Sequence, residues 1–155
     1  THLGIADVTK TWVPSELAPY SYLIDHEGVD AIMSAHIVNR QFDPDGNPGT
    51  LSYPIVTGLL RDSLGFDGVV FSDDMQMQAI TKYYGLEKSI RMAILAGIDV
   101  IIFANNVQGS TARTVETVHT IMKQLVEEGV LTEERINDSY RRIMTLKKKR
   151  LVSSN

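Results

Sequence analysis

Two adjacent aspartates, Asp73 and Asp74, follow three apolar residues and a serine in the sequence GVVFSDD, residues 68–74. Successive side chains of a strand point to opposite faces, so only one of the two carboxylates can face a cleft. We therefore expect one functional carboxylate and one structural carboxylate that caps the following helix. A Mg²⁺-dependent phosphoryl-transfer site is an alternative, although the chain has no glycine-rich loop that could hold a phosphate.

The four histidines differ in what their positions predict. His36 follows an apolar run and two small residues, so a functional and a structural role both remain open. His26 and His119 fall in predicted helices and are expected on the surface, and the pattern around His2 leaves its role undecided. No two histidines have metal-ligand spacing on one element, so we predict no metal site.

Two other segments contain residue types that often serve function but are expected to be structural here. Met75 and Met77 are typical packing residues. The sequence DPDGN, residues 43–47, resembles part of a calcium loop. Its glycine comes too early, however, and Pro54 stands where a bidentate glutamate would be required. This segment is predicted to form a turn within a polar loop, residues 39–52.

A phrase that occurs three times indicates the elements that position these residues. Each copy consists of glycine, an apolar residue, aspartate and a short apolar run, and the copies begin at Gly28, Gly65 and Gly97. Stretches with helical periodicity precede the second and third copies, and glycine is the usual residue just past a helix end. The apolar runs do not alternate with polar residues, which is typical of strands buried on both faces of a parallel sheet. Ser52 and Pro54 mark the start of the helix before Gly65.

Polar residues follow each of the three predicted strands. These clusters are Ser34–Ala35–His36, Ser72–Asp73–Asp74 and Ala104–Asn105–Asn106. Parallel strands end at one edge, where α/β proteins of both the barrel and the open-sheet type bind ligands. Further helices are predicted near residues 20–27, 112–128 and 133–150, the last with Thr132 as its N-cap and Ile136, Tyr140 and Ile143 on its apolar face. Periodicity alone leaves the barrel and the open sheet as alternatives.

The composition excludes several classes of protein. The formal net charge is −4, and the one basic run, residues 147–150, falls at a predicted helix end, so we expect no nucleic-acid partner. The 155 residues include no cysteine, which removes disulfides and thiolate chemistry. No apolar run approaches the roughly 20 residues of a membrane helix, and no signal peptide is recognisable. The missing methionine and leader suggest that the chain is a piece of a longer protein.

Residues 59–61 and 65–75, which read LLR and GFDGVVFSDDM, resemble the active-site signature of glycoside hydrolase family 3. The segments AIMSAH, residues 31–36, and AGID, residues 96–99, with Asn105 and Asn106, resemble the bacterial β-N-acetylglucosaminidase branch. That branch also has an Asp–Ser/Thr–His triplet on a mobile loop, whose last two residues are similar to Thr1 and His2. The residues after His2 match the family only loosely.

This resemblance implies a fold, an activity and a set of site residues. The implied fold is α/β: the C-terminal part of a (β/α)8 TIM-type barrel, with about three parallel strands and flanking helices, over residues 1–155. Asp73 would be the nucleophile of a retaining hydrolase that removes β-linked N-acetylglucosamine, and His2 would be the general acid/base. His36 and Met77 would be sugar contacts. No metal or cofactor is implied, and the substrate would be a peptidoglycan-derived or chitin-type oligosaccharide.

The resemblance also implies a partner and leaves alternatives open. The strands that grip the sugar would lie in a missing N-terminal half of the barrel, so we expect the isolated 155 residues to be inactive on aryl N-acetylglucosaminides. A family 3 β-glucosidase or β-xylosidase and a non-catalytic half-barrel remain alternatives. The implied source is bacterial, and both a cytoplasmic and an exported location remain open.

Overall fold

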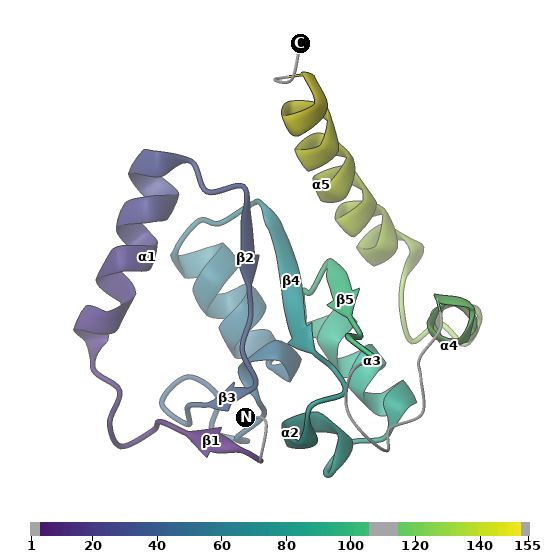
Figure 1. Ribbon diagram of the computed structural model, residues 1–155, viewed down its shortest axis with the longest axis horizontal. Coiled ribbons are helices and arrows are strands. Elements are labelled where there is room, and N and C mark those ends of the chain that lie inside the picture. The colour runs from purple at the N-terminus through teal and green to yellow at the C-terminus, as the bar shows by residue number, and fades with distance from the viewer. Residues whose placement is uncertain (1–3, 106–114, 153–155) are drawn as a thin grey trace.

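The computed structural model describes residues 4–105 and 115–152 and shows an α/β chain (Figure 1). Its strands are β1 (Ala6–Asp7), β2 (Ala31–Met33), β3 (Ile37–Val38), β4 (Val69–Asp74) and β5 (Val100–Ile102). The shorter helical segments are η1 (Pro14–Leu17), α1 (Ala18–Tyr22), η2 (Leu23–Glu27), η3 (Gly49–Leu51) and α2 (Gln78–Thr81). The longer helices are η4 (Pro54–Ser63), α3 (Leu86–Ala96), α4 (Val115–Glu127) and α5 (Glu133–Val152). No helix in the described part of the chain is long and apolar enough to span a membrane.

The three predicted strands form one parallel sheet in the order β2–β4–β5, which confirms the prediction. Ala31 pairs with Val69 and Met33 with Phe71, so β2 and β4 run side by side without a register shift. Between β4 and β5 the register shifts, since Phe71 pairs with Val100 but Asp74 pairs with Ile102. The same three carboxyl ends therefore lie along one edge of the sheet, as predicted.

The main core lies between this sheet and the helices η4 and α3, which cover one of its faces (Figure 1). Val70 of β4, Val56 of η4 and Ala93 of α3 are all buried in it, and Ile32 of β2 packs against them. Side chains of neighbouring strand residues point the other way. Met33, next to Ile32, lies on the opposite face and is 65% exposed.

The helix boundaries predicted from capping residues agree with the structure. The Ser52 hydroxyl accepts a hydrogen bond from Ile55 N–H at 3.3 Å near the start of η4. The Thr132 hydroxyl accepts one from Arg135 N–H at 3.1 Å at the start of α5. Gly97 ends α3 with φ of 118°, and a Cβ there would lie 2.8 Å from Thr57 Oγ1. Glycine is thus required at this position for both its conformation and its small size.

A second, two-stranded sheet was not predicted. β1 pairs in parallel with β3, with Ala6 opposite Ile37. Thr9 reinforces the pairing, because its hydroxyl accepts the Arg40 N–H at 2.9 Å and its carbonyl accepts the Gln41 side-chain amide at 2.6 Å. Strands of two residues are too short to show a hydrophobic periodicity, so neither of them can be predicted from a sequence pattern.

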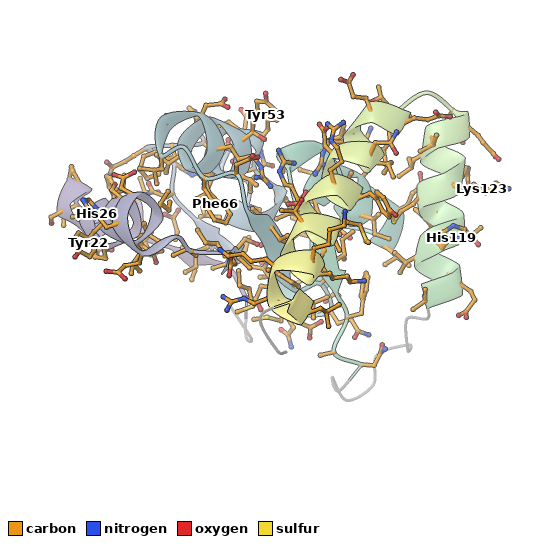
Figure 2. All side chains as sticks on the ribbon, turned by 90° about the horizontal axis from the view of Figure 1, so that it is seen from above. Tyr22, His26, Tyr53, Phe66, His119 and Lys123 are labelled. Atoms are coloured by element: carbon orange, nitrogen blue, oxygen red, sulfur yellow. The ribbon has the colours of Figure 1, made fainter. Side chains whose placement is uncertain are left out.

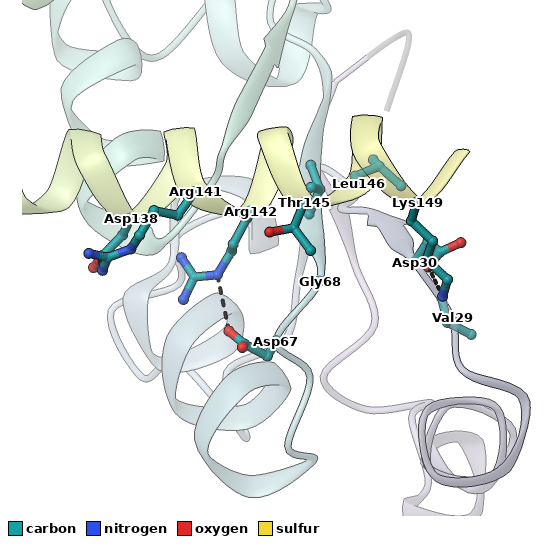
Figure 3. A pocket seen from close by; sticks show the side chains of 11 residues that line it. Val29, Asp30, Asp67, Gly68, Asp138, Arg141, Arg142, Thr145, Leu146 and Lys149 are labelled. Carbon is teal, nitrogen blue, oxygen red and sulfur yellow. Dashed lines mark hydrogen bonds and ion pairs between the residues drawn. The ribbon is translucent and has the colours of Figure 1, made fainter. Parts of the chain in front are cut away.

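The aspartates of the three repeated phrases all lie at the amino ends of the strands and face α5. Figure 3 shows Arg142 of α5 above Asp67, with 3.2 Å between Nε and Oδ1, and Lys149 beside Asp30 at 2.5 Å. Both pairs border a pocket of about 360 Å³ between α5 and the starts of β2 and β4. Arg150 also pairs with Asp30. The basic run near the end of α5 therefore binds the neighbouring strand unit in addition to lying at the negative end of the helix dipole.

The third of these aspartates, Asp99, is buried and joins four elements. Its Oδ2 accepts hydrogen bonds from Arg61 at 2.7 Å and from Val70 N–H at 3.0 Å. Its Oδ1 accepts the Ser139 hydroxyl at 2.6 Å and lies 3.7 Å from Arg135. Burial lowers the pKa of both arginines, and the Asp99 carboxylate opposes that shift. A buried carboxylate with such partners fixes β5 against β4, η4 and α5.

Candidate active site

The strand that ends in the two aspartates is bulged at its carboxyl end. Two residues of β4, Ser72 and Asp73, lie within the register shift, opposite the single residue Ile101 of β5. The buried Ser72 hydroxyl accepts the Ile102 N–H at 2.8 Å and so replaces a backbone acceptor. A bulge of this kind re-aims the side chain that it contains. The Ser72 hydroxyl thus supplies the acceptor that the irregular strand pairing does not provide. The following residue, Asp73, lies within the bulge and does not follow the regular alternation of side chains along the strand.

The two carboxylates of this strand end have different surroundings. Asp74 Oδ1 accepts the N–H groups of Gln76 and Ala104, each at 3.1 Å, and so ties the end of β4 to the residues after β5. Asp73 is partly buried, and its Oδ1 accepts the N–H of the next residue at 2.7 Å. Among the described residues, no hydrogen bond reaches Asp73 Oδ2. Asp74 is therefore the structural carboxylate, and it caps a turn and a neighbouring loop where a helix cap was expected. The functional role of Asp73 stays a prediction.

His36 lies directly behind this strand end. Its side chain is 0% exposed, and its Nε2 lies 2.9 Å from the backbone carbonyl oxygen of Asp74. A carbonyl can only accept, so Nε2 carries the proton and donates it. Burial lowers the pKa of His36, against the opposing effect of the Asp73 and Asp74 carboxylates. The imidazole is therefore neutral at pH 7, and its Nδ1 has no hydrogen-bond partner among the described residues.

A rigid shelf, which we define as residues 34–36 and 49–50, holds His36 in place. The Ser34 hydroxyl is 2.8 Å from the Thr50 hydroxyl, and Thr50 N–H donates to the Ala35 carbonyl at 3.2 Å. Ser34 N–H donates to the Phe71 carbonyl at 2.8 Å, which joins the shelf to β4. A Cβ on Gly49 would lie 2.9 Å from the Ala35 oxygen. The shelf is thus close-packed against the strand that carries Asp73.

The turn after Asp74 closes the site on its other side. Met77 N–H donates to the Asp74 carbonyl at 3.1 Å, so this oxygen accepts from both Met77 and His36. The Met77 side chain is only 5% exposed. The Gln76 side-chain oxygen accepts the Asn105 N–H at 2.7 Å, and Asn105 has φ of 54°, a left-handed conformation uncommon outside glycine. These contacts hold the residues after β5 beside the β4 turn.

The structure brings three of the four candidate residues together. His36 Nε2 and the Met77 N–H bind the Asp74 carbonyl, and Asp73 Oδ1 binds the Asp74 N–H. The fourth candidate, His2, lies outside the described residues, as does Asn106. The roles of His36 and Met77 as sugar contacts stay predictions. Sequence reasoning did not identify Gln76 or Thr50, whose polar side chains are buried at the site. The only signal for Gln76 was its position two residues after Asp74, and Thr50 stood in a loop that was read as polar turns.

The other two described histidines lie away from this edge. His26 stacks on Tyr22 at a centroid distance of 4.7 Å in the N-terminal helical segment, and His119 lies on α4 at the other end of the molecule (Figure 2). Both are exposed. The segment 43–47 forms a turn in which Asp43 accepts the Asp45 N–H and the Asn47 side chain, each at 3.0 Å. Within residues 4–105 and 115–152, no cluster of three or more His, Cys, Asp or Glu could hold a metal ion.

Known proteins resemble this chain in sequence and in fold. Residues 5–146 match the sequence pattern described as the glycosyl hydrolase family 3 N-terminal domain. A β-hexosaminidase of Nitrosomonas eutropha is 33% identical over 109 residues, which are 68% of this chain and 30% of that protein. The chain thus spans less than a third of the relative's length.

Solved structures give the same result for the fold. The chain superposes on a family 3 β-N-acetylglucosaminidase from Paenibacillus sp. FPU-7 with a TM-score of 0.80 and 33% identity, over 97% of this chain and 28% of that one. It superposes on a β-glucoside phosphorylase, BglX, with a TM-score of 0.79 and 26% identity, over 99% of this chain and 28% of that one. The three parallel strands and their helices are therefore part of a TIM-type barrel, as the sequence predicted. The chain belongs to glycoside hydrolase family 3.

Proposed function

We propose that this chain supplies the nucleophile of a retaining glycoside hydrolase that removes β-linked N-acetylglucosamine. The observation that carries the proposal is the contrast between two neighbouring carboxylates. Asp74 Oδ1 accepts two backbone N–H groups, one of them from Ala104 after β5, whereas Asp73 Oδ1 accepts only the N–H of the next residue among the described groups. A nucleophile needs a carboxylate oxygen that is held in place and yet open to the anomeric carbon.

In the proposed reaction, Asp73 attacks the anomeric carbon and the aglycone oxygen leaves. A covalent glycosyl-enzyme forms, and water then displaces the carboxylate. Asp73 Oδ1 already accepts the Asp74 N–H at 2.7 Å, which fixes the plane of the carboxylate and leaves Oδ2 to react. Neutral His36 adds no positive charge beside the nucleophile.

The second catalytic group is proposed to be His2. Retaining hydrolases need a group that protonates the leaving oxygen and later deprotonates water. Asp74 is unsuited to this role, because its Oδ1 is bonded to Gln76 N–H and Ala104 N–H and supports both loops. A histidine with an ordinary pKa near 6.5 can perform both steps near neutral pH. The assignment of His2 rests on its resemblance to the family's triplet.

The sugar and the acceptor are proposed from the names of relatives. The Nitrosomonas protein is named a β-hexosaminidase and the Paenibacillus protein a β-N-acetylglucosaminidase, which favours N-acetylglucosamine at the site. The similar β-glucoside phosphorylase raises phosphate as a second acceptor. Product analysis with and without phosphate distinguishes the two: water gives the free sugar, and phosphate gives a sugar 1-phosphate.

The test replaces Asp73 by asparagine in the longest natural form of the protein, including any sequence that flanks this chain. Asparagine keeps the shape of the side chain but is a poor nucleophile. We expect hydrolysis of an aryl β-N-acetylglucosaminide to fall at least about 10³-fold, which corresponds to about 4 kcal/mol of barrier. Asp67→Asn is the matched control, since Asp67 precedes the same strand, is 91% exposed and should leave turnover unchanged.

A trapping experiment tests the covalent step separately. A 5-fluoro N-acetylglucosaminide with a good leaving group should slow both steps and let the glycosyl-enzyme accumulate. Mass spectrometry should then find the sugar on the peptide that contains Asp73. Near-wild-type turnover of Asp73→Asn, or a label on another residue, would remove the proposal.

A further inference from the structure

We propose that His36 is a positioning residue that sets the orientation of Asp73 by donating a hydrogen bond to the Asp74 carbonyl. The inference rests on the proposed function for its effect on catalysis, although its structural part can be tested without it. His36 has no exposed surface, so it acts through the backbone of the strand end.

The contact lies just beyond the register shift, on a peptide unit whose N–H, that of Met75, donates to the Ile102 carbonyl of β5 at 3.0 Å. The register shift removes part of the regular ladder between β4 and β5 at Ser72 and Asp73. Beyond the shift, the Asp74 carbonyl accepts from His36 Nε2 at 2.9 Å and from Met77 N–H at 3.1 Å. The first bond comes from a different strand unit, residues 31–36, whereas the second is local to the turn. His36 is therefore the group that ties this peptide to the rest of the sheet on the β2 side.

The shelf behind His36 makes this contact rigid. Ser34 and Thr50 are joined through their hydroxyl groups, Thr50 N–H binds the Ala35 carbonyl, and Ser34 N–H binds β4 at Phe71. His36 and Thr50 are both completely buried. A donor held this way can fix a peptide to a fraction of an ångström, which a flexible surface side chain cannot.

The adjoining peptide unit determines where the nucleophile points. Asp73 is bonded through Oδ1 to the N–H of Asp74, and the carbonyl of Asp74 is the group that His36 holds. The carbonyl belongs to the 74–75 peptide unit and the N–H to the 73–74 unit. The two units are joined at the Asp74 Cα, so a displacement of the first is passed to the second. Loss of the His36 bond should therefore tilt the Asp73 carboxylate, and a misplacement of about 1 Å can reduce a rate about 10²-fold.

This role differs from that of a sugar contact in its kinetic signature. A residue that holds sugar in the ground state and the transition state alike changes KM with little change in kcat. A residue that only orients the nucleophile changes kcat and leaves KM nearly unchanged. The two roles can therefore be separated by one set of variants at position 36.

The kinetic experiment compares three substitutions in the longest natural form of the protein. His36→Met keeps an apolar side chain of similar length without a donor, and should lower kcat about 10–100-fold with KM changed less than about 3-fold. His36→Gln places an amide donor near the position of Nε2 and should restore kcat to within about 5-fold of wild type. His26→Gln is the control, because His26 also contacts a backbone carbonyl, that of Tyr22, but lies exposed and remote from the site. A rise in KM with unchanged kcat in His36→Met would overturn the positioning role.

Two measurements on the chain itself do not depend on activity. The ¹⁵N spectrum of the His36 imidazole at pH 7 should show the tautomer protonated at Nε2, and protonation at Nδ1 alone would overturn the proposed bond. This spectrum needs only the wild-type protein, so it applies even if His36→Met fails to fold. If His36→Met folds, the amides of Gln76 and Ala104, which bind Asp74 Oδ1, should exchange faster while those of α3 stay unchanged. Unchanged exchange would refute the inference, whereas absence of hydrolysis in the wild type would refute only the proposed function.

Discussion

Asp67 and Asp99 occupy the same place in two of the repeated phrases, yet their side chains have opposite surroundings. Asp67 is 91% exposed and pairs with Arg142, whereas Asp99 is 0% exposed and bonds to Arg61, Ser139 and a backbone N–H. The sequence motif alone predicted only that each aspartate precedes a strand. The burial of Asp99 follows from the placement of η4 and α5, which no local pattern encodes.

This contrast predicts different costs for the same substitution. Asp99→Asn removes the charge that balances Arg61 and Arg135 in a buried position and should lower the free energy of unfolding by about 3–5 kcal/mol. Asp67→Asn breaks an exposed pair and should cost no more than about 1 kcal/mol. Urea unfolding followed by circular dichroism measures both, and equal losses in the two variants would contradict the role assigned to Asp99.

The buried imidazole of His36 predicts a pH dependence of stability. Burial holds its pKa in the folded protein below the value of about 6.5 expected in the unfolded chain. As the pH falls through 6.5, the unfolded chain takes up a proton that the folded protein does not, so the free energy of unfolding decreases. The decrease should continue down to the lowered pKa of the folded state, with Asp73 and Asp74 limiting its extent.

His36→Gln removes this titration and serves as the comparison. The stability advantage of wild type over His36→Gln should shrink between pH 7.5 and pH 5.5, as measured by urea midpoints. His26→Gln should show the wild-type dependence over the same range, because His26 is exposed. A constant difference between wild type and His36→Gln would show that burial of His36 does not shift its titration.

At the scale of elements, the end of β4 shows where prediction from sequence succeeds and where it stops. The apolar run 69–71 and the flanking glycine gave the strand, and capping residues gave the boundaries of η4 and α5. The register shift at Ser72 was not foreseen, because a bulge depends on how two strands pair and not on either sequence alone. Strict alternation of side chains would also have placed the two aspartates on opposite faces of the sheet. It could not show that the Asp74 side chain binds the residues after β5.

Ser72 therefore makes a prediction about the element as a whole. In Ser72→Ala the Ile102 N–H loses its acceptor beside a buried site, which should cost about 1–3 kcal/mol of stability and lower kcat by loosening β4 against β5. Ser72→Thr keeps the hydroxyl and should stay close to wild type in both respects. Ser63→Ala is the control, since the exposed Ser63 hydroxyl donates to the Gly58 carbonyl in its own helix. Thermal unfolding and kinetics of the three variants together check the claim, and a harmless Ser72→Ala would refute it.

At the scale of the whole molecule, the helices among the described residues cover one face of the sheet. Val70 and Ile32 are packed beneath η4 and α3, but Met33 on the other face is 65% exposed and Phe71 is partly buried. Along β5, a groove of about 580 Å³ opens toward α4 and α5, with apolar side chains such as Ile101, Val118 and Ile136 in its walls. A TIM-type barrel fills its interior with strand side chains from all sides, and these apolar surfaces are of the kind that a closed barrel buries.

The open face predicts how the 155 residues behave alone in solution. Exposed contiguous apolar surface favours association, so sedimentation velocity should show a concentration-dependent increase in mass. Met33→Gln makes the β2 side of this face polar and should weaken the association without loss of stability, since Met33 is 65% exposed. Leu95→Gln is the matched control, because Leu95 is an exposed apolar residue on α3, away from the sheet face, and should leave the association unchanged. If the protein stays monomeric at every concentration, the open face of the sheet does not drive association. Equal effects of the two variants would mean that association does not involve the sheet.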